Sequence, residues 1–199
     1  MIRTFFTVFL LICTYPALAQ SGERQLKCLH QLEIQAVGPR IIGPSGLCLK
    51  GDSLFAVGDR SRGKIFYLDV DPAGGKVSSH AIKLKKKSIS KEYEGLGVDA
   101  NGIFYIACER GNQIVKVDPK DKVIQPFSGA LADKVKKSGM LQKENAGLEG
   151  VAIRPNGSGY AVAERSGRGL IQFLNGGAIF GTFNLDTLSV PGTAKRPGQ

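Results

Sequence analysis

The chain has 199 residues and a formal net charge of +10 at pH 7. This charge favours acidic partners, such as a phosphorylated small molecule or an anionic component of the cell envelope. No basic motif with interleaved aromatic residues is present, so a nucleic-acid partner is not expected. The two histidines, His30 and His80, have no serine or cysteine nucleophile at a recognisable spacing, and no phosphate-binding loop follows a strand. The composition therefore disfavours a Ser-His-Asp hydrolase and a P-loop nucleotide-binding protein.

The first residues have the three parts of a secretory signal peptide. Arg3 supplies a positive charge, an apolar run extends from Phe5 to Ile12, and the small residues Ala17-Leu18-Ala19 resemble a cleavage site. We expect residues 1–20 to be a signal peptide, with an uncleaved N-terminal anchor as the alternative. The mature chain is then periplasmic or secreted and has no transmembrane segment.

Three segments of the chain repeat the same pattern. Each begins with a Ser/Glu-Gly-Leu/Val motif and continues, 14 or 15 residues later, to an acidic residue. The motifs begin at Ser45, Glu94 and Glu149, and the later acid–arginine pairs are Asp59-Arg60, Glu109-Arg110 and Glu164-Arg165. The copies start 49 and 55 residues apart. A period of roughly this length in an all-β pattern indicates β-propeller blades.

Each repeat divides into four short strands separated by Gly, Asn and Asp turns. In the second repeat the strands are expected at 95–99, 103–108, 113–118 and 122–127, with an Asn-Gly turn at Asn101-Gly102. The sequence thus predicts an all-β partial propeller over residues 21–188, with one short helix at 131–137. Its four-stranded antiparallel blades are placed at about 43–85, 93–128 and 147–185, followed by a flexible tail at 189–199.

Three blades do not close a propeller, which has about four to eight. Residues 26–37 are expected to form one or two strands and to complete the last blade. Either the chain is a truncated or split gene product, or it associates to complete the propeller.

The repeated acidic residues are the candidate site. The first strand of a blade runs one way along the axis and the second runs back, so both ends of each motif return to one rim. We expect Asp59, Glu94, Glu109, Glu149 and Glu164 to form an arc there, where carboxylates could bind Ca²⁺. The alternative is structural, with the glutamates accepting backbone N–H bonds or pairing with Arg60, Arg110 and Arg165 to hold the blades together. In the functional interpretation these arginines bind an anionic substrate.

Cys28, Cys48 and Cys108 remain after signal cleavage, so at most one internal disulfide forms. Cys48 and Cys108 lie in apolar strand patterns typical of small buried side chains. Two lysine-rich loops, Lys83–Lys87 and Lys134–Lys143, lie between the apolar segments. Their charge either is solvated or attracts an anionic substrate.

The order Ser45-Gly46-Leu47, Asp59-Arg60, Glu94-Gly95-Leu96, Glu109-Arg110 and Asn145-Ala146-Gly147-Leu148-Glu149-Gly150 resembles the phytase-like esterase family ("esterase-like activity of phytase"). The SdiA-regulated propeller family is a close rival. The first resemblance implies an exported propeller that hydrolyses an ester, in particular a phosphoric ester, in a Ca²⁺-dependent manner. It places function on Asp59, Glu94, Glu109, Glu149 and Glu164. The alternative is a non-catalytic propeller that binds a ligand or partner.

Overall fold

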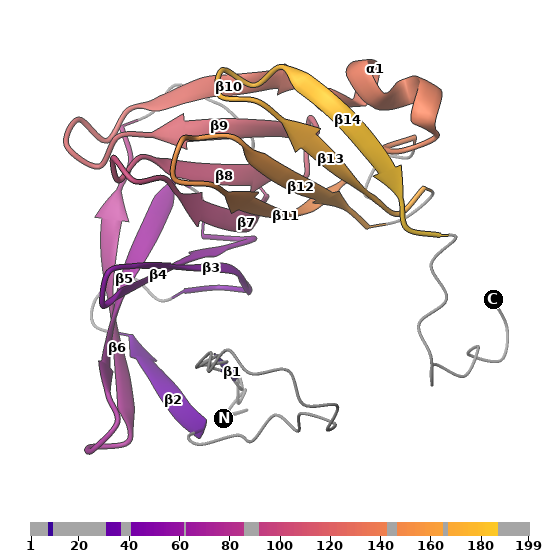
Figure 1. Cartoon of the computed structure of the whole chain (residues 1–199). Helices are drawn as coiled ribbons and strands as arrows, with labels where there is room; N and C mark the ends of the chain where they lie inside the picture. Colours follow the sequence, from indigo (N-terminus) through magenta and orange to yellow (C-terminus); the bar gives the residue numbers. More distant parts are fainter. Residues whose placement is uncertain are drawn as a thin grey trace, which may run out of the picture.

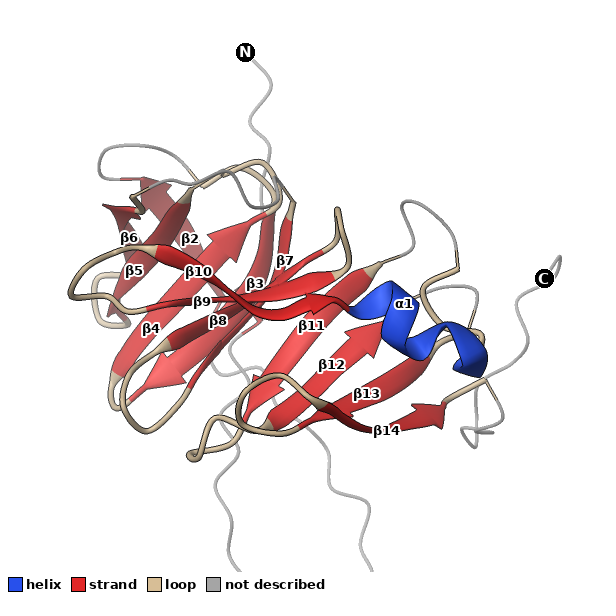
Figure 2. Ribbon diagram, turned by 90° about the horizontal axis from the view of Figure 1, so that it is seen from above, coloured by secondary structure: helices blue, strands red, loops and turns tan. Residues whose placement is uncertain are grey.

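The computed structural model describes residues 8–9, 31–36, 41–61, 63–85, 92–142, 147–164 and 167–186. Over these residues the chain is almost entirely β-structure, arranged as three units of four antiparallel strands. Figure 1 shows the three units side by side, and Figure 2 shows their order from above. The predicted fold class, an all-β partial propeller with three four-stranded blades, is confirmed.

The strands of each blade follow one another along the chain and pair with their sequence neighbours. The first blade contains β3 (Pro44–Lys50), β4 (Ser53–Gly58), β5 (Lys64–Asp71) and β6 (Lys76–Lys83). The second contains β7 (Tyr93–Val98), β8 (Phe104–Cys108), β9 (Gln113–Val117) and β10 (Ile124–Ala130). The third contains β11 (Leu148–Ile153), β12 (Gly159–Ala163), β13 (Gly169–Phe173) and β14 (Ile179–Asn184).

A short helical segment joins the second and third blades, as the sequence predicted. It comprises α1 (Leu131–Val135) and the 3-10 helix η1 (Lys136–Ser138). Leu131 and Val135 are buried against the strands, which explains why a segment this short stays helical. Within the described residues, no helix is long and apolar enough to cross a membrane.

The N-terminal strands occupy a different place from the one expected. The strand β2 (Gln31–Ala36) pairs in parallel with β6, and β1 (Val8–Phe9) pairs with β2. The expectation that residues 26–37 complete the last blade is therefore wrong for the part that is described. The outer strand of the first blade offers unpaired backbone groups, and β2 pairs with this nearby edge.

Tight turns fix the inner hairpins of the second and third blades. Gly102 and Gly157 both have a φ of 81°, a conformation that residues with a side chain rarely adopt. The Gly102 amide donates to the Asp99 carbonyl at 3.0 Å, and the Gly157 amide donates to the Arg154 carbonyl at 2.9 Å. Both glycines follow an asparagine, so the Asn-Gly dipeptides set the register of these hairpins.

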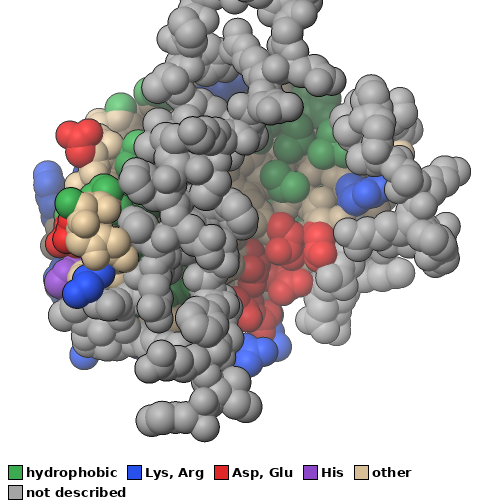
Figure 3. All heavy atoms as spheres, turned by 90° about the horizontal axis from the view of Figure 1, so that it is seen from below, with side chains coloured by type: hydrophobic (Ala, Val, Ile, Leu, Met, Phe, Trp, Pro, Cys, Tyr) green, Lys and Arg blue, Asp and Glu red, His purple; other side chains and the backbone are tan. Residues whose placement is uncertain are grey.

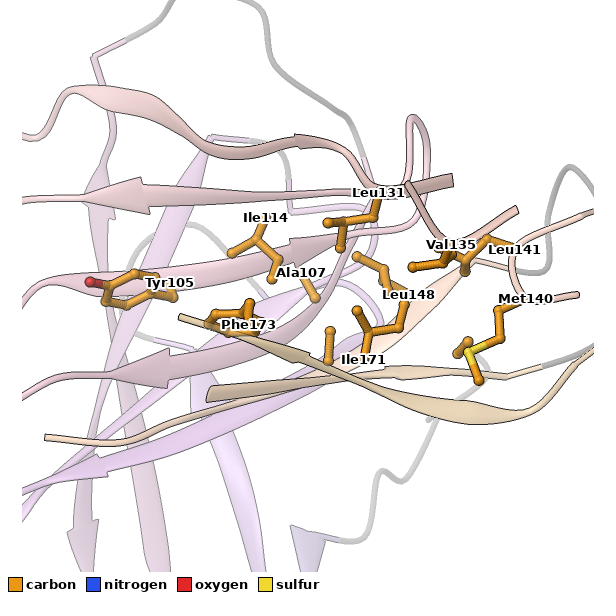
Figure 4. Close-up of a cluster of buried hydrophobic side chains, with 12 residues drawn as sticks. Tyr105, Ala107, Ile114, Leu131, Val135, Met140, Leu141, Leu148, Ile171 and Phe173 are labelled. Atoms are coloured by element: carbon orange, nitrogen blue, oxygen red, sulfur yellow. The ribbon is translucent and has the colours of Figure 1, made fainter. Parts of the chain in front are cut away.

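Apolar side chains fill the space between successive blades. Between the first and second blades, Val57 and Ile65 pack with Leu96, Ile106 and Val115. Figure 4 shows the corresponding cluster between the second and third blades, where side chains from both blades and from the helical segment meet. Burial of one such side chain stabilises the fold by about 1.5–3 kcal/mol. The blade-to-blade contacts are therefore the core of this protein.

The glycine of each repeated motif lets neighbouring inner strands approach backbone to backbone. A Cβ atom at Gly46 would lie 2.7 Å from the Leu96 amide nitrogen, and one at Gly95 would lie 2.7 Å from the Val151 amide nitrogen. Real Cβ atoms do not come this close to backbone, so only glycine fits at these two positions. The close approach brings β3, β7 and β11 side by side, and the equivalent ends of the three strands lie on the same side of the molecule.

Candidate functional site

Both ends of each repeated motif meet at the same end of its inner hairpin. The residue that follows the second strand donates its backbone N–H to a carbonyl two residues before the motif begins. These three bonds run from Asp59 to Gly43 (2.8 Å), from Glu109 to Glu92 (3.1 Å) and from Glu164 to Gly147 (3.3 Å). We call this end of the hairpins the rim, defined by Ser45, Asp59, Glu92, Glu94, Glu109, Glu149 and Glu164.

A β-bulge recurs at the start of the motif in every blade. The register of the inner strand pair shifts between Pro44 and Gly46, between Tyr93 and Gly95, and between Leu148 and Gly150. The extra residue in these bulges is Ser45, Glu94 and Glu149, respectively. A bulge re-aims the side chain of its extra residue and is common beside active sites. The β-bulge thus places the first residue of each motif at the rim.

Ser45 uses this position for a contact between blades. Its hydroxyl donates a hydrogen bond to the Tyr93 carbonyl oxygen, in the inner strand of the second blade. The first motif therefore has a neutral latch where the other two have a carboxylate.

Glu94 lies at the electrostatic centre of the rim. Burial, followed by the negative charges of Glu149, Asp59, Glu109 and Glu92, raises the pKa of Glu94 to about 7 from its ordinary value of 4.5. These charges come from all three blades, so the predicted arc does bring Asp59, Glu94, Glu109 and Glu149 within electrostatic reach of one another. A glutamate with this pKa exchanges its proton near neutral pH.

Glu92 belongs to the same group and was missed from the sequence. It lies two residues before Glu94, and its side chain is 3.3 Å from the Arg110 guanidinium. Arg110 was expected to bind substrate or to pair with a motif glutamate. The arginine of the first motif, Arg60, lies 3.6 Å from Asp59 and is largely exposed. No sequence signal marks Glu92, which lies at the rim because its carbonyl accepts a hydrogen bond from the Glu109 backbone N–H.

The last acid–arginine pair is described only in part. Glu164 is half-buried, and its charge is not among those that raise the pKa of Glu94. Arg165, a predicted substrate ligand, lies outside the described residues. Figure 3 shows acidic side chains gathered in one patch on the face seen from below, next to hydrophobic side chains and with basic side chains at its edge.

Comparison with known proteins identifies the family. A family model described as "esterase-like activity of phytase" matches residues 39–187, which is well over half of the chain. The chain belongs to the phytase-like family. No curated protein matches it. The family resemblance inferred from the three motifs is therefore confirmed.

Solved structures give the same fold for this phytase-like chain. A glutaminyl cyclase from Myxococcus xanthus is similar with a TM-score of 0.53 and 16% identity, over 74% of this chain and 58% of the cyclase. A virginiamycin B lyase from Staphylococcus aureus has a TM-score of 0.45 and 16% identity, over 72% of this chain and 41% of the lyase. The chain thus spans about half the length of these structures. At 16% identity the similarity to the cyclase shows the fold and nothing about activity.

The phytase-like chain was expected to bind Ca²⁺ through its rim carboxylates. Among the residues that the structure describes, no three or more His, Cys, Asp or Glu side chains form a group that could hold a metal ion. The carboxylates are close enough to raise the pKa of Glu94 but do not form a ready cage of oxygen ligands, of which Ca²⁺ takes about six to eight. Binding of Ca²⁺ at the rim therefore stays a prediction.

Other nucleophiles are poorly placed for catalysis. Cys48 and Cys108 do not form a disulfide with each other, and Cys28 lies outside the described residues. Burial raises the pKa of the Cys48 thiol to about 12, which keeps it protonated and unreactive at neutral pH. His80 is exposed on the outer strand β6, next to Tyr67. Four lysines of the two basic segments are exposed, namely Lys83, Lys85, Lys134 and Lys137.

Proposed function

We propose that this phytase-like chain forms the site of an ester hydrolase and that Glu94 transfers the proton. The observation that carries the proposal is the position of Glu94 on a bulge, facing carboxylates from all three blades, with its pKa raised to about 7. A general acid or base works best when its pKa is near the working pH, and proton transfer contributes about 10²–10⁴-fold to rate. Near pH 7 Glu94 is protonated in about half of the molecules.

The reaction that follows is hydrolysis with proton transfer at the rim. A water oxygen attacks the acyl carbon or phosphorus of the ester, and the bond to the leaving oxygen breaks. Protonated Glu94 gives its proton to that leaving oxygen, which departs as an alcohol. A neighbouring carboxylate, from Glu149 or Glu109, accepts the proton that the water loses. The half-buried setting of Glu94 excludes part of the solvent and strengthens its interactions with neighbouring charges.

The charge of the rim restricts the substrate. Glu94 and the four carboxylates that raise its pKa lie at the rim, while Arg60 and Arg110 lie beside Asp59 and Glu92. A neutral carboxylic ester meets little repulsion in this setting. A phosphate ester is anionic and would need a cation beside it, and Ca²⁺ is the ion that the family resemblance implies. We therefore propose Ca²⁺ dependence for phosphate esters only.

The test compares esters whose leaving groups differ in basicity. Acetic and phosphoric esters of 4-nitrophenol and of ethanol are incubated with the purified chain, with Ca²⁺ or with a chelator. Glu94→Gln should lower the rate with ethyl esters about 100-fold, because an alkoxide needs a proton, and should affect 4-nitrophenyl esters less. The control is Asp52→Asn, an exposed carboxylate in the turn at the opposite end of the first hairpin, which should change neither rate.

The pH profile adds an independent measurement. Wild-type hydrolysis of ethyl esters should fall as the pH rises through about 7, because Glu94 loses the proton that it donates. A rate that is independent of pH in this range, or unchanged in Glu94→Gln, contradicts the assignment. Phosphate-ester hydrolysis that persists in chelator contradicts the role of Ca²⁺.

A non-catalytic, ligand-binding propeller is the second candidate. It is favoured by the contacts that tie rim residues to structure, namely the Ser45 bond to Tyr93 and the pairs of Arg60 with Asp59 and Arg110 with Glu92. If no ester is hydrolysed and Glu94→Gln lowers only the melting temperature, the rim carboxylates act as latches and this candidate replaces the first.

A further inference from the structure

Three asparagines of the chain are followed directly by glycine, and each of these pairs lies in a tight turn. The pairs are Asn101-Gly102, Asn156-Gly157 and Asn175-Gly176. An Asn-Gly pair is chemically labile, because glycine has no side chain to keep its backbone nitrogen away from the carbonyl carbon of the asparagine side chain. None of these residues lies at the rim, so their reactivity is a separate property of the molecule.

The reaction is an internal cyclisation followed by hydrolysis. The backbone nitrogen of the glycine loses its proton to base in the solvent and attacks the side-chain carbonyl carbon of the asparagine. A new carbon–nitrogen bond closes a succinimide ring, the bond from that carbon to the side-chain amide nitrogen breaks, and ammonia leaves. Water then opens the ring at either carbonyl, which gives aspartate or isoaspartate. No oxidant or reductant takes part.

In two of the three turns the glycine N–H is held in a hydrogen bond. Gly102 is the fourth residue of the turn that begins at Asp99, and its N–H donates to the Asp99 carbonyl at 3.0 Å. Gly157 has the same place in the turn that begins at Arg154, and its N–H donates to that carbonyl at 2.9 Å. Both glycines are also buried. Reaction at either pair therefore requires the turn to open first.

The third pair is shifted by one position within its turn. This turn begins at Leu174, and the bond that closes it comes from the N–H of Gly177, at 2.9 Å. Gly176 is the third residue, and its φ of 101° favours glycine. Within the described part of the chain the Gly176 N–H donates to no acceptor, and Asn175 and Gly176 are both exposed. The reacting nitrogen is thus accessible to solvent base while the turn stays closed.

The asparagine side chains differ in the same direction. The Asn156 side-chain oxygen accepts hydrogen bonds from the Ser158 backbone N–H at 3.1 Å and from the Ser158 hydroxyl at 2.7 Å. These bonds hold the side-chain carbonyl in one orientation, so they must break before it turns toward Gly157. In the ranges that the structure describes, the side chains of Asn101 and Asn175 make no hydrogen bond. Asn156 is therefore the best protected of the three.

We propose that Asn175 is the deamidation site of this chain, where aspartate and isoaspartate form spontaneously and ahead of any reaction at Asn101 or Asn156. The order of reaction is Asn175 first, Asn101 second and Asn156 last. It follows from the position of each glycine in its turn and from the bonds of each asparagine side chain. The inference is independent of the proposed hydrolysis, because it uses no residue of the rim.

The product changes the outer edge of the third blade. The reactive turn joins β13 to β14, the outer strand of this blade (Figure 2). Isoaspartate lengthens the main chain of the turn by one methylene group, and both products add a negative charge. The register of β13 and β14 already shifts between Gln172 and Phe173, close to the turn, and β14 is largely exposed. The modified turn should therefore weaken the pairing of β14 while β11 and β12 stay paired.

Peptide mapping of aged protein tests the order. The folded chain is kept in mildly alkaline buffer, sampled over days and digested with trypsin, which leaves the three pairs in three different peptides. Mass spectrometry measures the conversion of amide to acid at each pair, and labelling by an isoaspartate methyltransferase measures isoaspartate. The same peptides, aged after digestion, give the rate of each pair in the absence of the fold.

Asn175 should react in the folded chain nearly as fast as in its peptide. Asn101 should be slowed about fivefold and Asn156 about 100-fold, for one and three hydrogen bonds that must break. Ser158→Ala removes one bond to Asn156 and should speed that site about fivefold, with the rate at Asn175 unchanged. Circular dichroism checks that this variant is folded. Equal rates at the three pairs in the folded wild type, or a slower reaction at Asn175 than at Asn101, overturn the proposal.

Hydrogen exchange measures the consequence for the third blade. Amides of β14 should lose protection in aged wild type and keep it in Asn175→Ala aged in the same way, because alanine cannot form the succinimide. Protection that falls equally in both proteins would show that the loss has another cause and would overturn the effect assigned to the turn.

Discussion

The second and third blades share one motif in one register, yet they differ in what surrounds them. The second blade has a neighbour on each face, and its central strand β8 is buried throughout. The third blade has a described neighbour on one face only, and its equivalent strand β12 alternates between buried and partly exposed positions. The difference arises from the neighbours and not from the local sequence, since both strands are apolar.

This contrast teaches that the stability of a blade is largely supplied by the next one. A repeat protein is stabilised by contacts between successive repeats as well as by each repeat itself. Equivalent residues in the two blades should therefore contribute differently to the free energy of unfolding, and the more deeply buried residue should contribute more. Matched substitutions in the two blades can measure this difference directly.

The largest effect is expected for the pair Ile114 and Leu170, which occupy equivalent positions in β9 and β13. Ile114→Ala should lower the free energy of unfolding by about 4 kcal/mol, because a fully buried side chain leaves a cavity. Leu170→Ala should cost about 1 kcal/mol, since its side chain is half-buried. Urea denaturation at two protein concentrations separates this loss from any change in association. Equal losses would mean that the third blade is covered as fully as the second.

A smaller effect is expected for the motif glycines. Gly95→Ala should cost about 2 kcal/mol, because the new methyl group would lie 2.7 Å from the Gly150 and Val151 backbone and must push β7 and β11 apart. Gly150→Ala should be nearly neutral in the monomer, since its methyl group would make only an ordinary contact with Val162. Thermal melting of dilute protein compares the two. A neutral Gly95→Ala would show that the inner strands do not pack as closely as described here.

Much of the architecture could be predicted because equivalent positions in the repeated motifs mark equivalent positions in the strands. Three motifs with similar internal spacing predicted four-stranded blades, and the turn at Gly102 marked where one hairpin reverses. The same logic placed Asp59, Glu94, Glu109 and Glu149 near one another. These predictions needed only local periodicity and the rotation that relates one blade to the next.

The features that were missed depend on pairing between strands. The bulge at Glu94 is a mismatch between β7 and β8, and neither strand shows it alone. Glu92 reaches the rim because its carbonyl accepts the Glu109 amide, a contact set by that same mismatch. The strand β2 pairs with β6 because that edge was free, which depends on the whole sheet.

The smallest effect is expected in the pH dependence of stability, for two rim glutamates with unequal surroundings. Glu94 lies in the central blade, with acidic neighbours in the blades on both sides, whereas Glu149 has its described neighbours on one side. In the unfolded chain Glu94 releases its proton near pH 4.5, but in the folded chain it does so near pH 7. The folded state therefore binds more protons between these values, and Glu94 costs increasing stability as the pH rises from 4.5 to 7.

Glu94→Gln removes this cost. At pH 8 the variant should be more stable than the wild type by about 1 kcal/mol, after allowance for solvent screening of a half-buried side chain, and at pH 4 the two should be equal. Asp52→Asn, in an exposed turn, should show no such difference. Glu149→Gln should move the stability transition to lower pH, because it removes the charge with the largest electrostatic effect on Glu94. Chemical denaturation at several pH values gives the measurement. A latch role for Glu94 predicts the opposite sign, because the variant would lose a stabilising bond at high pH, so the direction of the change alone separates a strained proton-transfer group from a structural one.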